Sequence, residues 1–595
     1  MKKHTIKFLT LLCITVMLYT SCKKDALQNQ ENNFEQKETK TSAGISIVLG
    51  AKQTNAYTVE NMLEAYKNLK AKENLSRNSS ASTSSLVLPD LATMQNILVA
   101  NTKYVRVLPR NDEDFDSLRE VYDTLEFSDF PLDYDLSQVG NYYHDPSLPD
   151  SQITWQYVVL KKSDNISSYF QQQLITDNIF LAENSPYYNQ YPESFWDNLE
   201  AAALQRVGQS DKLVNPTSPS SARYRPNGNI KVLDDQLAQI IGLEGAKIMA
   251  YASWRHSKAY TDINGNFSGN HTFITKCSYF IKWESDNHRG RKYDIRSGWY
   301  GQAWTFLQGN SYNACYKTLD RSFQSGLPLF YASIHRGIYD VYFHDPFGLS
   351  NPRIRLKIWG KDGGYLVNPN GTGIFHPIAS IVGGPDIVIW RYEQYLNGPI
   401  FEKNTLKTYG TTVHEVGHAI QRSLGIAQFA FCSNLIRESW ADCVEWCFVM
   451  HKYNAPNSIY ASDTRFNVLN SPEVGANLNY IEYPSTNFIY NFDRNTSKVN
   501  LSYTPLFIDI IDNVPCNSQF TISNFNNGIS VCPKDVVGGY SLKEIENCLA
   551  NKDWSVSWSA NLDHIKTWLY NNSTNPTKYS LAPYLQWYYN YYKGN

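Results

Sequence analysis

The stretch TTVHEVGHAI, residues 411–420, places two histidines four positions apart with a glutamate directly after the first. In a helix, His414 and His418 lie one turn apart on the same face, so that both imidazoles can bind one metal ion. Glu415 lies beside that face, where it can reach a water on the same ion. The spacing therefore predicts a helix that carries two metal ligands and a general base.

The neighbours of these three side chains are apolar or small, which is typical of a buried helix and not of a solvated one. They are Val413, Val416, Gly417, Ala419 and Ile420. Gly425 follows the last predicted helical residue, Leu424, and is suited to the left-handed position that often ends a helix. We therefore predict a bounded, buried helix.

A third metal ligand is expected from a second helix, because a catalytic zinc site has three protein ligands and one open position. The segment RESWAD, residues 437–442, supplies Glu438, and Asp442 lies four residues further on the same helical face. Asp442 is predicted to accept a hydrogen bond from the free ring nitrogen of a ligating histidine and so to fix its tautomer.

With H-E-x-x-H and E-x-x-x-D together, this part of the chain resembles the gluzincins, the thermolysin-like clan of zinc metallopeptidases. A metzincin would need a glycine and a third histidine shortly after His418, but the chain has no further histidine before His451. The resemblance implies one Zn²⁺ per chain on His414, His418 and Glu438, with Glu415 as the catalytic base. Tyr503 is the candidate oxyanion stabiliser, and no histidine motif for that role is visible downstream.

The same resemblance implies a zincin-like catalytic domain over residues 297–595. Such a domain has a mixed sheet over the metal-binding helix and a largely helical lower subdomain. In zincins an edge strand above that helix binds extended peptide by strand addition. Asp386–Trp390, the last predicted strand before the helix, is the expected edge strand.

The N-terminus reads as an export signal over residues 1–21, with Lys2-Lys3 followed by an apolar run. Its end resembles a bacterial lipoprotein signal in which Cys22 is lipidated; plain secretion with Cys22 discarded is the alternative. Residues 22–43 are polar and are expected to be a flexible tether. The expected location is the bacterial cell envelope, with the lipid anchored in the outer membrane or at the cell surface.

Two further regions are predicted between the tether and the catalytic domain. Residues 44–213 should form a small α+β region, either a removable propeptide or a permanent accessory domain, with a helix over Ser167–Phe180. Residues 228–296 read as a β-sandwich with an Asn264-Gly265 hairpin turn. They resemble the transthyretin-like, regulatory-like domains of carboxypeptidases. The chain is thus predicted to be an α+β multidomain protein.

We do not expect nucleic-acid binding, because the net charge is −2, charged residues make up 18% of the sequence and no basic cluster occurs. Cys443 and Cys447 are predicted to be core residues or partners of other segments and not a second metal site, and Cys516 and Cys532 are predicted to pair. The predicted function is a zinc peptidase, an endopeptidase acting on proteins or peptides outside the cytoplasm. Two alternatives stay open: an inactive, peptidase-like surface lipoprotein that binds glycan or protein partners, and a zinc aminopeptidase.

Overall fold

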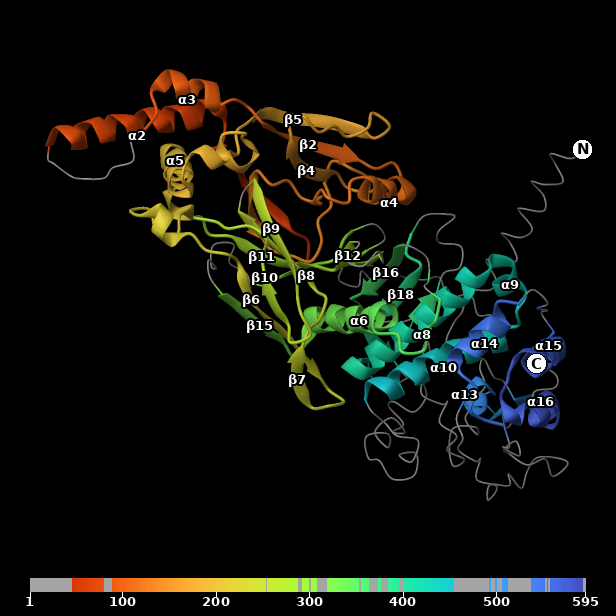
Figure 1. The fold of residues 1–595 in the computed structure, drawn as a ribbon. Coiled ribbons are helices and arrows are strands. Elements are labelled where there is room, and N and C mark those ends of the chain that lie inside the picture. The colour runs from red at the N-terminus through yellow and green to blue at the C-terminus, as the bar shows by residue number, and fades with distance from the viewer. Residues whose placement is uncertain are drawn as a thin grey trace, which may run out of the picture. The chain divides into compact units, whose positions relative to one another are not determined.

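The computed structural model describes residues 45–79, 88–252, 254–286, 292–298, 301–307, 318–350, 352, 355–362, 373–375, 384–394, 400–453, 492–493, 498–499, 506–511, 537–551, 554 and 557–591. This part is an α+β protein with several sheets (Figure 1). It divides into two compact units. The N-terminal unit comprises Ser42–Val232 and Ile240–Gln324, and the C-terminal unit includes Leu233–Gln239 and Ser325–Asn595.

The first part of the N-terminal unit is built on an antiparallel sheet in the order β4-β2-β5. Its central strand β2 (Thr102–Leu108) pairs with β4 (Gln156–Lys161) and with β5 (Gln171–Ile179). The helix predicted over Ser167–Phe180 is wrong, since β5 occupies most of it. Pairing with β2 satisfies the backbone of this polar segment, so tertiary context overrides its weak local preference.

Helices and a small sheet complete this part of the unit. Asn111 caps α4 by accepting a 2.8 Å hydrogen bond from the backbone of Asp114, as its place before an acidic first turn predicts. The elements are β1 (Val48–Lys52), α2 (Val59–Ser79), α3 (Leu91–Ile97), α4 (Asp112–Val121), β3 (Tyr134–Gln138) and α5 (Glu193–Arg206).

The remainder of the N-terminal unit contains two larger sheets and a hairpin. One sheet has the order β10-β6-β15, with β7 also paired to β6, and the other has the order β14-β11-β8-β9. The strands are β6 (Asn227–Asp234), β7 (Gln239–Gly242), β8 (Lys247–Ala252), β9 (Arg255–Tyr260), β10 (Asn266–Ser268), β11 (Ser278–Lys282), β12 (Glu284–Asp286), β13 (Lys292–Arg296), β14 (Trp304–Phe306) and β15 (Thr318–Phe323).

The Asn264-Gly265 turn lies between β9 and β10, but the predicted hairpin is wrong, because β9 pairs with β8 and β10 pairs with β6. Gly265 has φ +82°, and a Cβ there would lie 2.0 Å from the carbonyl oxygen of Ile230. Only glycine fits both demands. Residues 45–213 and 228–296 belong to the same unit, apart from Leu233–Gln239, which are part of the C-terminal unit. The transthyretin-like character of the second range stays a prediction.

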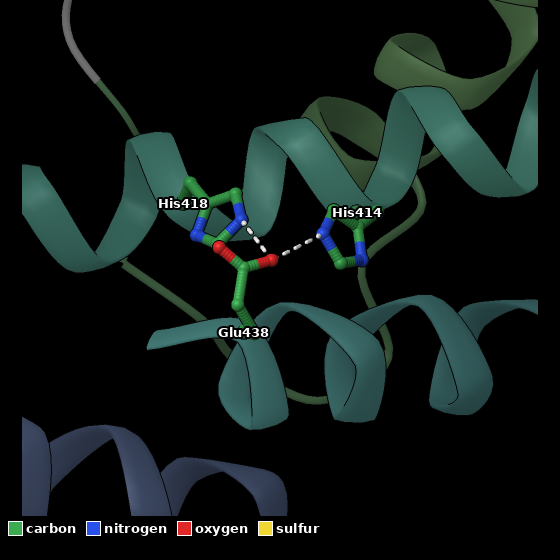
Figure 2. A group of neighbouring side chains, drawn as sticks. All are labelled: His414, His418 and Glu438. Carbon is green, nitrogen blue, oxygen red and sulfur yellow. Dashed lines mark ion pairs between the residues drawn. The ribbon is translucent and has the colours of Figure 1, made fainter. Parts of the chain in front are cut away.

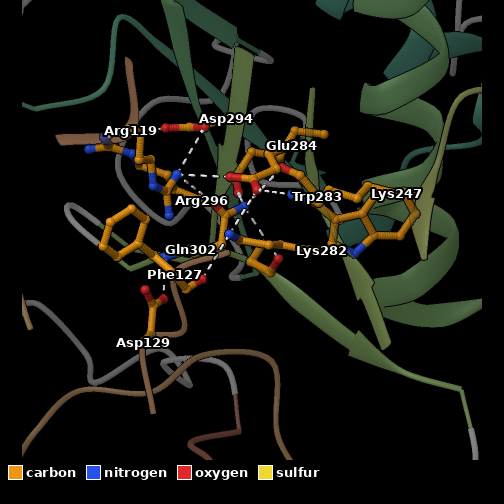
Figure 3. A network of polar contacts seen from close by, with 12 residues as sticks. Arg119, Phe127, Asp129, Lys247, Lys282, Trp283, Glu284, Asp294, Arg296 and Gln302 are labelled. Atoms are coloured by element: carbon orange, nitrogen blue, oxygen red, sulfur yellow. Dashed lines mark hydrogen bonds and ion pairs between the residues drawn. The ribbon is translucent and has the colours of Figure 1, made fainter. Parts of the chain in front are cut away.

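A buried network of charges runs through the N-terminal unit (Figure 3). Arg119 lies 2.9 Å from Glu284 and 3.3 Å from Asp294, and Glu126 lies 2.7 Å from the Lys247 ammonium. Lys282, 2.7 Å from Glu284, donates to the Phe127 carbonyl, and Arg296 donates to Asp112. Four of these groups come from residues 112–129 and five from residues 247–296, so the network joins the two parts of the unit.

The C-terminal unit contains the helix with the H-E-x-x-H stretch, α8 (Thr405–Leu424), packed between α6 (Gly326–Phe343) and α10 (Asn434–Lys452). Asn404 caps α8, because its side-chain oxygen accepts a 2.8 Å hydrogen bond from the backbone N–H of Lys407. The helix ends at Leu424 as predicted, but Gly425 has φ 166°, which is extended backbone and not the predicted left-handed conformation.

Three described strands of the same unit are hydrogen-bonded in the order β16-β18-β17. They are β16 (Arg355–Lys361), β17 (Gly373–Phe375) and β18 (Ile387–Trp390). The prediction that Asp386–Trp390 is the edge strand is wrong, because β18 pairs with β16 on one side and with antiparallel β17 on the other. β17 takes the edge position and packs against α8. Its three residues are too few to produce a strand pattern in the sequence.

The remaining described elements of the C-terminal unit are short strands and mostly helices. They are β19 (Tyr392–Gln394), β20 (Ile400–Glu402), α9 (Ile426–Phe431), β21 (Phe492–Asp493), β22 (Lys498–Val499), α13 (Leu506–Ile511), α14 (Leu542–Leu549), α15 (Trp558–Asn572) and α16 (Leu581–Tyr591). Within the described ranges, no helix combines the length and the apolar character needed to cross a membrane. The predicted signal, Cys22, the tether, Tyr503 and the Cys516/Cys532 pair lie outside the described residues.

Candidate metal centre

The two histidines of α8 and Glu438 of α10 converge on one point (Figure 2). One carboxylate oxygen of Glu438 lies 3.5 Å from Nε2 of His414 and 3.4 Å from Nε2 of His418. All three side chains are at most 1% exposed. The three residues form a buried group whose ligand atoms could hold a metal ion.

The separations between these atoms discriminate between a metal site and an ordinary hydrogen-bonded cluster. Bonds of about 2.0–2.1 Å that meet at the tetrahedral angle separate two ligand atoms by about 3.3 Å. The separations of 3.5 and 3.4 Å between the Glu438 oxygen and the two Nε2 atoms are close to that value. They are longer than an ordinary N–H···O hydrogen bond. Two imidazoles and one carboxylate are also a ligand set suited to a transition metal.

The electrostatics of the three groups fit metal binding. Burial lowers the pKa of His418, an effect that Glu438 opposes and that His414 and Arg437 reinforce. The neutral imidazole is the form that binds a metal. Burial raises the pKa of Glu438, but the two histidines outweigh burial and hold that pKa below its usual range. Glu438 is therefore a carboxylate, the form that binds a metal.

Two further carboxylates lie at the other ring nitrogen of His414. Oδ1 of Asp442 is 2.8 Å from Nδ1 of His414, and Oε2 of Glu445 is 3.4 Å from the same nitrogen. Both residues are 2% exposed and come from α10. The sequence interpretation singled out Asp442 but missed Glu445, although Glu438, Asp442 and Glu445 follow the i, i+4, i+7 spacing of one helical face.

A close approach of α8 and α10 brings the ligands together. A Cβ on Gly417 would lie 3.2 Å from Cα of Ala441 and 3.3 Å from Cβ of Val444. The indole of Trp440, which is fully buried, donates a 2.9 Å hydrogen bond to the carbonyl of Gly417. Gly417 and Trp440 thus set the distance between the helix of the histidines and the helix of Glu438.

Two aromatic rings and a buried cation lie around His418. The ring of Phe375 on β17 stacks 6.2 Å from the His418 ring, and Phe429 on α9 lies edge-on at 6.5 Å. Arg437 lies over the Phe429 ring at 5.0 Å and donates to Asn434. None of these neighbours of His418 follows from the H-E-x-x-H pattern, because they come from other elements.

Of the predicted site residues, His414, His418 and Glu438 form one group, and Asp442 lies against His414. Glu415 is 1% exposed on α8, between the two histidines. Cys443 and Cys447, predicted as core residues, are buried at 0% and 4% exposure.

No family model matches this chain, and a search of curated proteins finds no match.

Proposed function

We propose that this protein is a zinc-dependent peptidase that binds one Zn²⁺ through His414, His418 and Glu438. The observation that carries the proposal is the near-tetrahedral separation of the two Nε2 atoms from one oxygen of Glu438. The resemblance of residues 411–442 to the gluzincins supplies the reaction class. Zinc, when bound, would lower the pKa of a water and polarise the scissile carbonyl.

The chain's own residues supply the remaining chemistry. Glu415 accepts a proton from the attacking water and then delivers it to the leaving amine. Asp442 holds the tautomer of His414 in which Nε2 carries the lone pair for the metal. Phe375 and Phe429 exclude water from one side of His418.

The edge strand β17 is the proposed binding edge for an extended peptide. It replaces β18 in this role, because both edges of β18 are already hydrogen-bonded, one to β16 and the other to β17. Strand addition would give affinity through main-chain hydrogen bonds with little demand on side-chain identity. The substrate class is therefore a protein or peptide in extended conformation.

Metal content and turnover test the proposal together. We expect about one zinc per chain in the wild type and none in His418→Ala. Glu415→Gln should retain zinc and lose nearly all cleavage of a casein-like protein substrate. A wild type that takes up no zinc, or a Glu415→Gln variant as active as the wild type, would contradict the proposal.

The aminopeptidase alternative differs in what it requires of the substrate. An aminopeptidase needs a free α-amine on its substrate, whereas an endopeptidase cleaves N-blocked and free peptides alike. Equal cleavage of the two would support the endopeptidase. Zinc binding without cleavage of either would favour the inactive binding protein.

A further inference from the structure

The second group of possible ligands, His414, Asp442 and Glu445, needs an explanation of its own. It shares His414 with the first group but uses the opposite ring nitrogen. Two explanations compete: a second metal ion bound by Nδ1 and the two carboxylates, or a pair of carboxylates that position the imidazole.

The distances favour positioning. Oδ1 of Asp442 lies 2.8 Å from Nδ1 of His414, which is a hydrogen-bond distance and is too short for two ligands of one tetrahedral metal at about 3.3 Å. These two atoms are therefore not placed as ligands of one metal ion. Oε2 of Glu445 lies 3.4 Å from the same nitrogen, so the negative charge of a second carboxylate faces this side of the ring.

The chain makes room for Glu445 at this place. A Cβ on Gly410, one turn before His414 on α8, would lie 2.5 Å from Oε1 of Glu445. Glycine lowers helix stability by about 1 kcal/mol relative to alanine. The helix thus accepts a less favourable residue at the position where the Glu445 carboxylate packs against it.

We propose that Glu445 is a second positioning residue for His414, which it holds together with Asp442. This inference rests on the proposed zinc site and deepens it. The N–H of a metal-bound imidazole is more positive than that of a free one, so metal binding offsets the repulsion between the two carboxylates. Their negative charge in turn strengthens the bond from Nε2 to the metal.

Zinc affinity of the full-length protein, measured by competition with a chromophoric chelator, tests the inference. We expect Glu445→Gln to weaken zinc binding about 10-fold and Asp442→Asn by 10- to 100-fold. The double variant should weaken binding by less than the product of the two effects, because both carboxylates act on one imidazole.

Two additional variants separate positioning from general destabilisation. Gly410→Ala improves helix propensity but displaces the Glu445 carboxylate, so it should weaken zinc binding while the helices stay folded. Glu546→Gln changes another buried glutamate of the C-terminal unit, 1% exposed and bonded to the backbone of Ser350, and should leave zinc affinity unchanged.

The visible spectrum of the cobalt-substituted protein reports on the metal geometry directly. A shift of the ligand-field bands in Glu445→Gln and Gly410→Ala, but not in Glu546→Gln, supports positioning. Unchanged zinc affinity and spectrum in a folded Glu445→Gln would overturn it. Two zinc ions in the wild type and one in Glu445→Gln would replace it with a second metal site.

If the wild type binds one zinc but cleaves no peptide, the peptidase proposal fails while the role of Glu445 is still decided by the zinc affinity of the variants. No zinc in the wild type overturns both.

Discussion

Glu438 shows how little freedom a single ligand has at this site. One oxygen of its carboxylate faces both Nε2 atoms at nearly equal distances, 3.5 and 3.4 Å. Glu438→Asp keeps the charge but withdraws the oxygen by one methylene. We expect zinc affinity to fall by more than the roughly 10- to 100-fold that an outer carboxylate contributes. Chelator competition measures the change, and equal affinity for both proteins would show that Glu438 is not a ligand.

Glu126 links the stability of the N-terminal unit to pH. Burial raises the pKa of Glu126, but Lys247, Lys282 and Lys258 outweigh it and lower that pKa from 4.5 to about 2. Because the pKa of Glu126 is lower in the folded protein than in the unfolded chain, its ionisation stabilises the fold at pH values above 4.5. This stabilisation is lost as the pH falls from 4.5 to about 2.

Removal of this carboxylate should therefore matter most at neutral pH. Glu126→Gln leaves buried Lys247 without one carboxylate, which costs about 3–5 kcal/mol. Denaturant unfolding should show a large difference from the wild type at pH 7 that shrinks between about pH 4.5 and 2. A difference that stays constant across this window would contradict the linkage.

At the scale of elements, the α8–α10 contact controls the metal site through Gly417. Its Cβ position is already within 3.2–3.3 Å of two α10 residues, so Gly417→Ala must push the helices apart. We expect a loss of about 1–3 kcal/mol in unfolding free energy and weaker zinc binding. Gly348→Ser, at an open position with positive φ, is the control: it should lower stability without changing zinc affinity. Zinc affinity retained in Gly417→Ala would show that the helix distance is not critical.

Elements with a strong local signal could be predicted from the sequence. The helix that carries His414 and His418, its end at Leu424 and the positive-φ turn at Asn264-Gly265 all have local signals in the sequence. The details differ, since Gly425 is in extended backbone and the strands beside the turn pair with other strands. The grouping of His414, His418 and Glu438 follows from the same helical spacing combined with a known ligand pattern.

Features that depend on partners distant in sequence could not be predicted. β5 is a strand because β2 pairs with it, and β17 is the edge because it pairs with β18. The position of Glu445 depends on the crossing of α8 over α10, which also requires Gly410. The spacing within α10 places Glu445 on the face of Glu438 and Asp442, but no pattern within a single segment shows where α8 crosses that face.

For the whole molecule, the charge network favours a permanent domain over a removable propeptide. Residues 112–129 supply Asp112, Arg119 and Glu126 to partners between Lys247 and Arg296, all at most 7% exposed. Removing one partner of a buried pair costs about 3–5 kcal/mol, so three such losses would match the 5–15 kcal/mol by which a domain is stable. The hydrophobic core is shared as well, since Tyr104 and Trp254 pack edge to face with ring centroids 4.7 Å apart.

We therefore expect residues 44–213 to remain part of the mature protein. A specific protease site inserted at the exposed segment Pro216–Ser218 permits a clean cut between the two parts. After cleavage, the fragments should co-elute in gel filtration and separate only in denaturant. The Arg119→Met variant removes the positive charge that pairs with Glu284 and Asp294. Its two fragments should therefore separate at a lower denaturant concentration. Release of residues 44–213 without denaturant, accompanied by a gain in peptidase activity, would instead establish a propeptide, because a permanent domain cannot leave without exposing the buried charges it pairs.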